Sequence, residues 1–277
     1  MRNRLFSYNL VDTPIHRLSG LTKLIAFLFL TFAVMFSYDI RVILAVMVFS
    51  FYILRVSKIK FSQIKMMLIF VIIFLVTNVI ITYLFSPEEG VGIYGTRHEV
   101  FHIVGRYSIT LEQLLYQTTK FFKYASVIPL GMIFLLTTNP SEFASSLNRV
   151  GVNYKAAYAV SLTLRYFPDI QREYVDISLA QQARGLELSR KAKLTDRFKN
   201  SLLITVPLIF STLDRIENIS NAMDLRGFGK HKKRTWYNAK KMGKDDLLAI
   251  IISFLIFLGT VSVSVFVNRS RFYNPFL

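Results

Sequence analysis

The chain has 277 residues, 53% of them hydrophobic, and carries 34 Lys and Arg against 17 Asp and Glu, a formal net charge of +17. High hydrophobicity with a basic excess fits either a nucleic-acid-binding protein or a membrane protein with basic cytoplasmic segments. The absence of Cys excludes disulfides and metal sites built on thiolates.

Five apolar runs favour the membrane protein, because each predicts a membrane-spanning helix. They are about Leu21–Tyr38, Ile40–Leu54, Met66–Phe85, Leu111–Thr138 and Leu247–Val267. About twenty uncharged residues, as in the third run, cross a hydrocarbon core of about 30 Å. The turn at Ser37–Asp39 predicts a helical hairpin, and Pro129 predicts a kink in the fourth helix. Charged residues are nearly absent from the runs, so we expect no ion relay within the chain.

The segment between the third and fourth runs, Ser86–Ile109, is expected to be a Gly-rich polar loop on the outside. Its "GVGIYG" (Gly90–Gly95) fits the Gly-x-Gly-x-x-Gly pattern, but a dinucleotide site needs that pattern inside a βαβ unit. We therefore expect these glycines to form flexible turns. His98 and His102 have only Glu99 beside them, which favours exposed loop histidines over a zinc site.

The distribution of Lys and Arg predicts that the N-terminus is cytoplasmic and, after five spans, that the C-terminus is external. The chain then divides into a membrane domain with four spans (1–138), a cytoplasmic domain (139–246), and the last span with an external tail (247–277). The predicted fold is an all-α polytopic membrane protein with long cytoplasmic helices.

The cytoplasmic domain is patterned as helices. Ser141 is expected to cap a helix that follows Pro140, and two long helices are expected to stop at Gly185 and Gly227. Apolar residues at spacings of four, three, three and four form a stripe on the last of these helices: Ile209, Leu213, Ile216, Ile219 and Met223. Its apolar part, 201–213, is short and contains Pro207, so we expect it to lie on the membrane surface or against other helices, not across the membrane.

Both long helices end in Arg-Gly, in "AQQARG" and "NAMDLRG". Gly is favoured just after a helix, and Arg in the last turn complements the helix dipole, so both phrases can be ordinary helix ends. The alternative is that each helix tip presents a guanidinium, which is always charged and binds a carboxylate through two bonds. Two such tips would fit acidic sockets on a partner with two lobes.

Two segments, "LRYFPDIQREYVDISLAQQARG" and "RIENISNAMDLRGFG", resemble the signature regions of the transmembrane (T) component of energy-coupling factor transporters. "DTPIHRLSGLTKL" and "LTTNPSEFASSL" also resemble that family, so the resemblance covers most of the chain. It implies a non-catalytic subunit in a prokaryotic cell membrane. Such a subunit lies between two ATP-binding-cassette (ABC) ATPases and a small membrane protein, the S component, which binds a vitamin or other micronutrient.

The resemblance also implies the docking residues. One tip, Ala183, Arg184 and Gly185, would contact one ATPase; the other, Leu225, Arg226 and Gly227, would contact the second. Leu225 departs from the Ala of the family pattern, which leaves the fit of that tip open. ATP and Mg would be bound by the partner ATPases, and no cofactor by this chain. The approach of the two ATPases toward each other would move the two long helices as levers and tilt the S component.

Other interpretations remain. "GKHKKR" (Gly229–Arg234) lacks the first Gly of a phosphate-binding loop, because Asp224 stands there. This basic run and Lys240, Lys241 and Lys244 lie before the last span, which favours contact with anionic membrane lipid over nucleic acid. The alternative function is a self-sufficient secondary transporter or channel, which would need polar residues or broken helices at mid-membrane. A lipid-modifying enzyme would need an acidic or His cluster, and none is evident.

Overall fold

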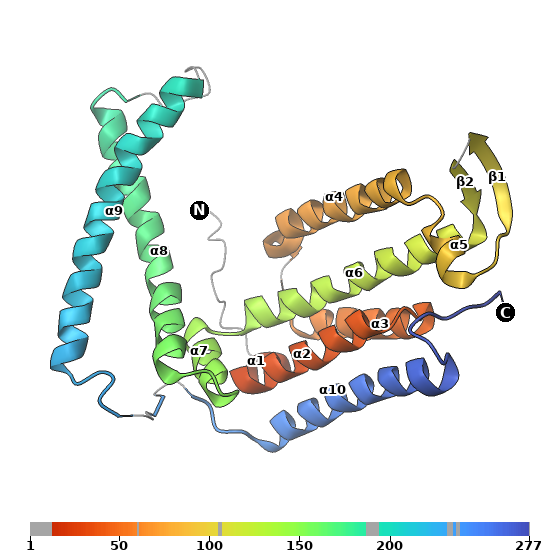
Figure 1. The fold of residues 1–277 in the computed structure, drawn as a ribbon. Coiled ribbons are helices and arrows are strands. Elements are labelled where there is room, and N and C mark those ends of the chain that lie inside the picture. Colours follow the sequence, from red (N-terminus) through yellow and green to blue (C-terminus); the bar gives the residue numbers. More distant parts are fainter. Residues whose placement is uncertain are drawn as a thin grey trace. The chain divides into compact units, whose positions relative to one another are not determined.

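A computed structural model describes residues 13–59, 61–104, 107–186, 194–231, 235–236 and 239–276. Within these residues the regular secondary structure is helical apart from one hairpin, and the chain forms two compact units (Figure 1). The first unit comprises Met1–Asn139 and Lys240–Leu277, and the second comprises Pro140–Ala239. The last helix thus belongs to the same unit as the first four apolar runs.

Each of the five predicted spans is helical. They are α2 (Gly20–Phe36), α3 (Ile40–Val56), α4 (Phe61–Phe85), α6 (Leu111–Thr137) and α10 (Lys244–Ser262), which continues as a π-helix, η1, over Val263–Val267. Among the described residues, three helices are long and apolar enough to cross a membrane: Ile64–Phe85, Leu111–Thr137 and Lys244–Val267. The structure therefore shows an all-α polytopic membrane protein, and spanning by α2 and α3, 17 residues each, stays a prediction.

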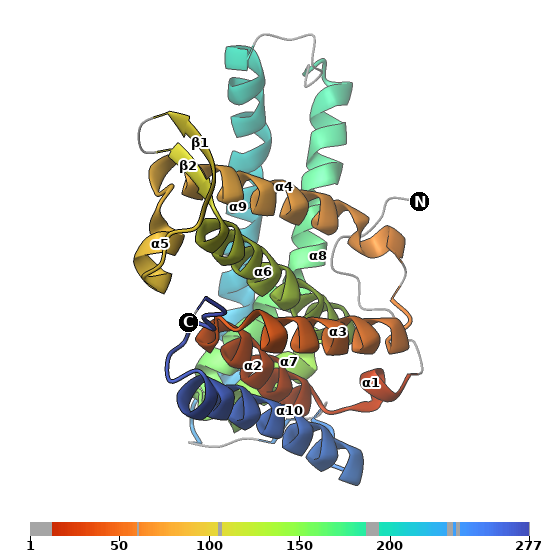
Figure 2. The same ribbon diagram turned by 90° about the vertical axis from the view of Figure 1, so that its right-hand side faces the viewer.

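The first unit is built around α2. Ser19 caps its beginning by accepting a hydrogen bond from the Thr22 amide, and Asp39 caps α3 in the same way from the Arg41 amide. The short turn between α2 and α3 is present as predicted. The two helices nevertheless pack mainly on other elements, α2 on α10 and α3 on α6 (Figure 2).

Two buried lysines join α2 and α6, which run antiparallel. Lys23 of α2 donates to the carbonyl of Thr137, the last residue of α6, at 2.7 Å. Lys123 of α6 donates to the carbonyl of Met35, near the end of α2, also at 2.7 Å. Each lysine therefore satisfies a carbonyl that the other helix leaves without an intrahelical partner. Neither role was predicted from the sequence, in which charged residues are nearly absent from the apolar runs.

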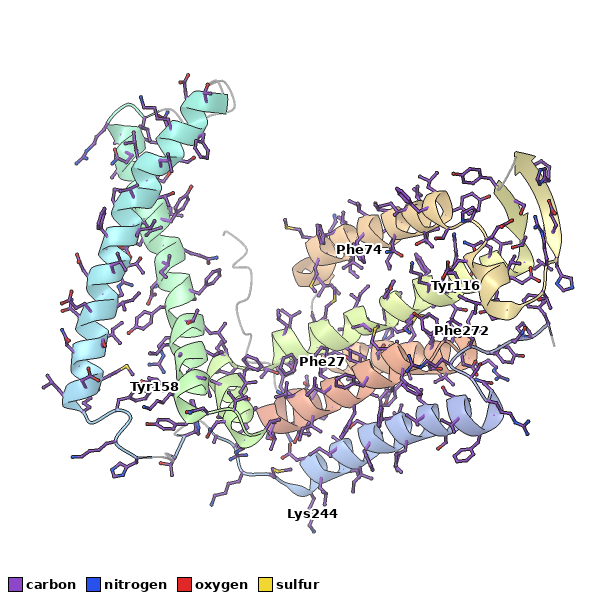
Figure 3. The ribbon with its side chains drawn as sticks, in the orientation of Figure 1. Phe27, Phe74, Tyr116, Tyr158, Lys244 and Phe272 are labelled. Atoms are coloured by element: carbon purple, nitrogen blue, oxygen red, sulfur yellow. The ribbon has the colours of Figure 1, made fainter. Side chains whose placement is uncertain are left out.

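One aromatic pair lies between the two lysine contacts, and an aromatic ring lies against one of the lysines. Phe27 of α2 stacks on Phe134 of α6, with ring centroids 5.2 Å apart (Figure 3). Lys123 also lies over the ring of Tyr38, 3.3 Å from its centroid. Since a helix rises about 1.5 Å per residue, the two lysine contacts are about 20 Å apart along the helices. They mark the two ends of the α2–α6 interface.

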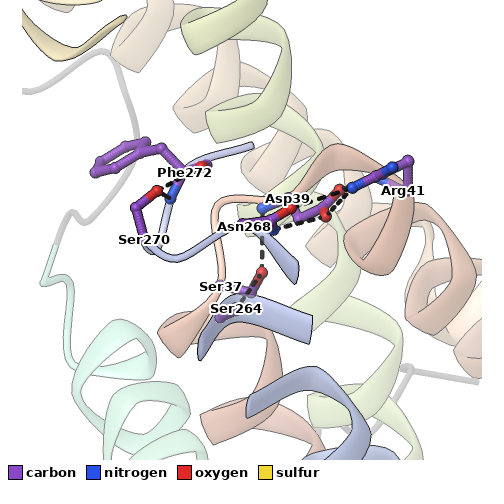
Figure 4. Close-up of polar contacts among 7 residues, drawn as sticks. All are labelled: Ser37, Asp39, Arg41, Ser264, Asn268, Ser270 and Phe272. Carbon is purple, nitrogen blue, oxygen red and sulfur yellow. Dashed lines mark hydrogen bonds and ion pairs between the residues drawn. The ribbon is translucent and has the colours of Figure 1, made fainter. Parts of the chain in front are cut away.

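A polar cluster joins the segment after α10 and η1 to the turn between α2 and α3 (Figure 4). The fully buried carboxylate of Asp39 accepts hydrogen bonds from Arg41 at 2.8 and 3.1 Å and from the Asn268 amide at 2.9 Å. The Tyr38 amide donates to the Arg271 carbonyl at 2.7 Å. Burial raises the pKa of Asp39, but the bonds from Arg41 and Asn268 outweigh it and lower the pKa below its ordinary value.

The predicted loop at Ser86–Ile109 is wrong, because this segment contains secondary structure. It forms α5 (Glu89–Tyr94) and an antiparallel hairpin of β1 (Glu99–Val104) and β2 (Tyr107–Thr110). Gly90 is no flexible turn: its amide donates to Gln113, and a Cβ there would lie 2.5 Å from the Glu112 carbonyl oxygen. The glycine is needed for the close approach of α5 to α6.

The second unit contains α7 (Pro140–Arg149), α8 (Tyr154–Ala183) and α9 (Leu194–Leu225). The expected cap at Ser141 is wrong, because α7 already begins at Pro140. Proline suits the first helical position, where its missing N–H would have no partner anyway, so Ser141 falls inside the first turn. The predicted three-part domain division depends on membrane sidedness and stays a prediction.

Removing the Lys123 cap tests the α2–α6 junction. In Lys123→Met the Met35 carbonyl loses its side-chain donor, and we expect the free energy of unfolding to fall by about 1–3 kcal/mol. The control is Lys120→Met, which removes a half-buried bond to Thr82 on α4 and should cost less. Thermal unfolding of the purified protein in detergent measures both. Equal loss in the two variants would contradict a special role for Lys123.

The Asp39 cluster predicts a defined pH dependence. Because the folded pKa lies below the unfolded value of about 3.9, the carboxylate stabilises the fold fully above that value. This contribution is lost as the pH falls through the lowered folded pKa. Asp39→Asn should therefore reduce the melting temperature at neutral pH and flatten its acid dependence, while the exposed Asp245→Asn leaves both unchanged. A variant as acid-sensitive as the wild type would contradict this assignment.

Candidate functional site

The two Arg-Gly tips are held by a pair of long antiparallel helices in the second unit. Helix α8 has 30 residues and α9 has 32, so each is about 45 Å long at a rise of about 1.5 Å per residue. Glu173 of α8 contacts Ser211 and Arg215 of α9, and its bond from Arg215 is 3.0 Å long. Because the helices run in opposite directions, their C-terminal tips lie at opposite ends of the pair (Figure 1).

Both tips close with the same hydrogen-bond geometry. At the first, Gly185 donates to the Gln182 carbonyl at 3.0 Å and Leu186 donates to the Gln181 carbonyl at 3.1 Å. At the second, Gly227 donates to Asp224 and Phe228 to Met223, each at 2.9 Å. This pattern is the Schellman motif, and both glycines have the left-handed backbone that it requires, with φ of 88° and 66°. The predicted helix ends at Gly185 and Gly227 are thus confirmed.

The predicted docking residues at the tips are exposed, except Gly227. Ala183, Arg184 and Gly185 are exposed at the first tip; at the second, Leu225 is 91% exposed and Arg226 is exposed, while Gly227 is half-buried. Within the described residues, neither arginine side chain forms a hydrogen bond or an ion pair. Each guanidinium is therefore presented to solvent at the end of a helix, where it can bind an external carboxylate.

The second tip packs on aromatic side chains at the beginning of α8, a contact that the sequence did not predict. Phe228, the residue after Gly227, contacts Tyr154 and Tyr158 at the beginning of α8, with ring centroids 5.7 and 4.9 Å apart (Figure 3). Trp236 lies against Tyr158 and donates to Asn148 of α7 at 3.1 Å. At the first tip, Leu186 is half-buried, and the residues that follow it, 187–193, lie outside the described residues.

The apolar stripe on α9 is mostly not a packing face within the second unit. Ile209, Leu213 and Ile216 are 51%, 54% and 56% exposed, and only Ile219 and Met223 are half-buried. The contact with α8 lies on another side of α9, where Ser211 and Arg215 meet Glu173. Three residues of the stripe therefore form an exposed apolar surface on α9.

The other motifs take structural roles. His98 bonds through Nδ1 to the fully buried carboxylate of Glu112 at 2.6 Å, and His102 bonds to Glu99 at 2.9 Å. Both side chains are about half exposed, and they do not share a helix face, because β1 begins at Glu99. No cluster of three or more His, Cys, Asp or Glu that could hold a metal ion occurs among the described residues.

The basic run is only partly described. Gly229, Lys230 and His231 belong to the described residues, whereas positions 232–234 and Tyr237 lie outside them. The Lys155 ammonium lies close to Gly229, 3.1 Å from where a Cβ would stand. Trp236 is engaged by Tyr158 and Asn148, which favours a structural role over a stacking platform for bases.

Residues 12–237 match the family model described as "Cobalt transport protein", CbiQ. The energy-coupling factor transporter transmembrane protein EcfT of Bacillus selenitireducens is 28% identical over 93% of this chain and 95% of its own length. The EcfT proteins of Staphylococcus aureus and Exiguobacterium sibiricum are 24% and 26% identical over 95% and 90% of this chain and 99% and 93% of their own lengths.

The chain belongs to the CbiQ family of energy-coupling factor transmembrane components. The resemblance carried by the two signature regions is thereby confirmed. A putative ABC transporter ATP-binding protein of Bifidobacterium longum is also similar, 33% identical over 54% of this chain and 20% of its own length. This CbiQ-family chain is accordingly a membrane-bound transporter component.

Substituting the tip glycines tests their geometry. A Cβ at Gly185 would meet no atom within 4 Å, so Gly185→Ala should cost only the backbone strain of about 1 kcal/mol and increase amide hydrogen exchange in the last turn of α8. Gly92→Ala is the control, because Gly92 also has open space but lies inside α5 without a positive φ. Equal exchange in the last turn of α8 in both variants would contradict the left-handed helix end.

Proposed function

We propose that this CbiQ-family component couples two ABC ATPases to a separate S component in an ATP-driven importer of vitamins or other micronutrients. The observation that carries the proposal is the pair of tips. They share one backbone geometry, lie at opposite ends of α8 and α9, and leave both arginine side chains without partners among the described residues. A helix that merely stops does not require an exposed arginine.

The docking roles follow from the tips. Ala183, Arg184 and Gly185 contact one ATPase, and Leu225, Arg226 and Gly227 contact the other. Each guanidinium binds an acidic socket, and the small or apolar residue before it packs against the socket wall. The ABC identity of these partners is supported by the family and by the similar region in the Bifidobacterium ATP-binding protein. ATP and Mg bind to those ATPases.

The motion is transmitted by α8 and α9 acting as levers. When ATP brings the two ATPases together, each displaces the helix end that it holds, and the stiff helices carry the displacement along their length. The contact of Glu173 with Ser211 and Arg215 makes the pair move together. The exposed surface of Ile209, Leu213 and Ile216 is the face on which the S component packs and through which it is tilted.

The proposal places the N-terminus and the second unit on the cytoplasmic side of a prokaryotic cell membrane, where ATP is available, and the C-terminus outside. The excess of Lys and Arg near the predicted inside ends of the spans supports this orientation. The S component selects the substrate, and this chain contributes no substrate site.

Charge reversal at the tips tests the coupling role. The protein is purified in detergent from cells that co-express its candidate ABC ATPases, and the retained ATPase is quantified. Arg184→Glu and Arg226→Glu should each weaken retention, by about 2–5 kcal/mol per lost desolvated pair, and the double variant should retain none. The matched control is Arg165→Glu, an exposed arginine on α8 away from both tips, which should retain wild-type amounts.

Equal retention by the double variant would reduce both tips to ordinary helix ends. If the wild type itself binds no ATPase, the self-sufficient transporter becomes the better hypothesis. Substrate uptake by proteoliposomes that contain this chain alone would then establish it.

A further inference from the structure

The first unit contains a partly open apolar cavity of about 220 Å³ between α1 (Pro14–Arg17) and the helices α2, α3, α6 and α10. Residues from all five helices line it, among them Ile15, Ala26, Ile53, Phe134 and Ala249. Three polar residues also line it: Thr22, Lys23 and Ser253. Each already makes a hydrogen bond, to Ser19, Thr137 and the Ala249 carbonyl respectively.

The chemistry of the cavity selects a hydrocarbon ligand. Its polar side chains bond to the protein, so it offers little to a polar solute. An apolar cavity of about 150 Å³ in another protein stays dry and binds small apolar molecules, and this cavity is larger. Two of the helices that line it, α6 and α10, are long and apolar enough to cross a membrane, where the abundant hydrocarbon is the acyl chain of a lipid.

The basic residues around the cavity favour a lipid with an anionic headgroup. The cavity lies where α2 and α10 begin and where α3 and α6 end, and the exposed side chains there are basic: Arg17, Arg55, Lys58, Lys240, Lys241 and Lys244. Of the two acidic residues at the start of α10, Asp246 is buried and accepts from the Ser19 and Gly243 amides, which leaves Asp245 exposed. Such a cationic surface attracts anionic lipid headgroups.

Lys244 connects the charge with the cavity. It lies at the beginning of α10 (Figure 3), one turn before Leu248, which lines the cavity, so the two residues are neighbours on the helix surface. Lys240 also approaches the cavity wall, because its ammonium donates to the His16 carbonyl of α1 at 3.2 Å.

We propose that this cavity binds one acyl chain of an anionic phospholipid whose headgroup lies against Lys241 and Lys244. The site is independent of ATPase docking. In this site α10 bridges α1 and the α2–α6 pair. The bound acyl chain therefore completes the packing of the first unit.

Competitive lipid binding to the full chain tests the site. The protein is delipidated in mild detergent and mixed with equal amounts of phosphatidylglycerol and phosphatidylcholine that carry identical acyl chains. Native mass spectrometry counts the bound lipid. We expect phosphatidylglycerol to bind about fivefold more than phosphatidylcholine. Ala249→Phe fills the cavity and should abolish binding, whereas Ala45→Phe, at an exposed position of α3, should not.

The double variant Lys241→Gln, Lys244→Gln should still bind lipid but lose the preference for phosphatidylglycerol. Wild-type binding by Ala249→Phe would overturn the cavity as the site. Equal binding of both lipids by the wild type would overturn the anionic headgroup. If Ala249→Phe aggregates, Ala26→Leu fills less of the cavity, and its lipid binding must still fall below that of Ala45→Phe for the proposal to stand.

Discussion

The first unit depends on two lysines that each satisfy the end of a helix to which they do not belong. Hydrocarbon offers no water for the last carbonyls of a helix, so a helix that ends inside a membrane bundle needs donors from its neighbours. Lys23 supplies one to α6 and Lys123 supplies one to α2. The exchange fixes the antiparallel register of the pair, and it gives the carboxyl end of α2, a helix of 17 residues, a donor from its neighbour.

The same requirement explains the polar residues at both ends of α10. At its beginning, Asp246 accepts the amides of Ser19 and Gly243 and so joins the first turns of α2 and α10. After its end, Asn268 reaches the Asp39 carboxylate that caps α3. Buried charges are costly unless they are paired, and here each one satisfies backbone groups that would otherwise be buried without partners. The few charged residues of the bundle thus hold it together.

The sequence was sufficient where the signal is local or periodic. Apolar runs placed the five long helices of the first unit, and Arg-Gly placed the ends of α8 and α9 within a residue. It was insufficient where the outcome depends on residues far apart in the chain. The hairpin after α5 is held by Glu112, which accepts from Thr96 and His98. Nothing near "GVGIYG" indicates that Gly90 must touch α6. Likewise, Lys23 and Lys123 are 100 positions apart, and only the fold shows that they act on each other's helices.

The two tips share one backbone geometry but differ in their support, and this difference bears on coupling. At the second tip, Phe228 rests on Tyr154 and Tyr158, so the end of α9 is tied to the beginning of α8. A force on Arg226 therefore reaches both helices at once. The first tip combines small Ala183 with Arg184, whereas the second presents the exposed Leu225 beside Arg226. An exposed leucine gains by burial, so the second socket is expected to be the more apolar one. Under the proposed docking, two sockets with different linings would discriminate between the tips and give a single chain a fixed orientation between two ATPases.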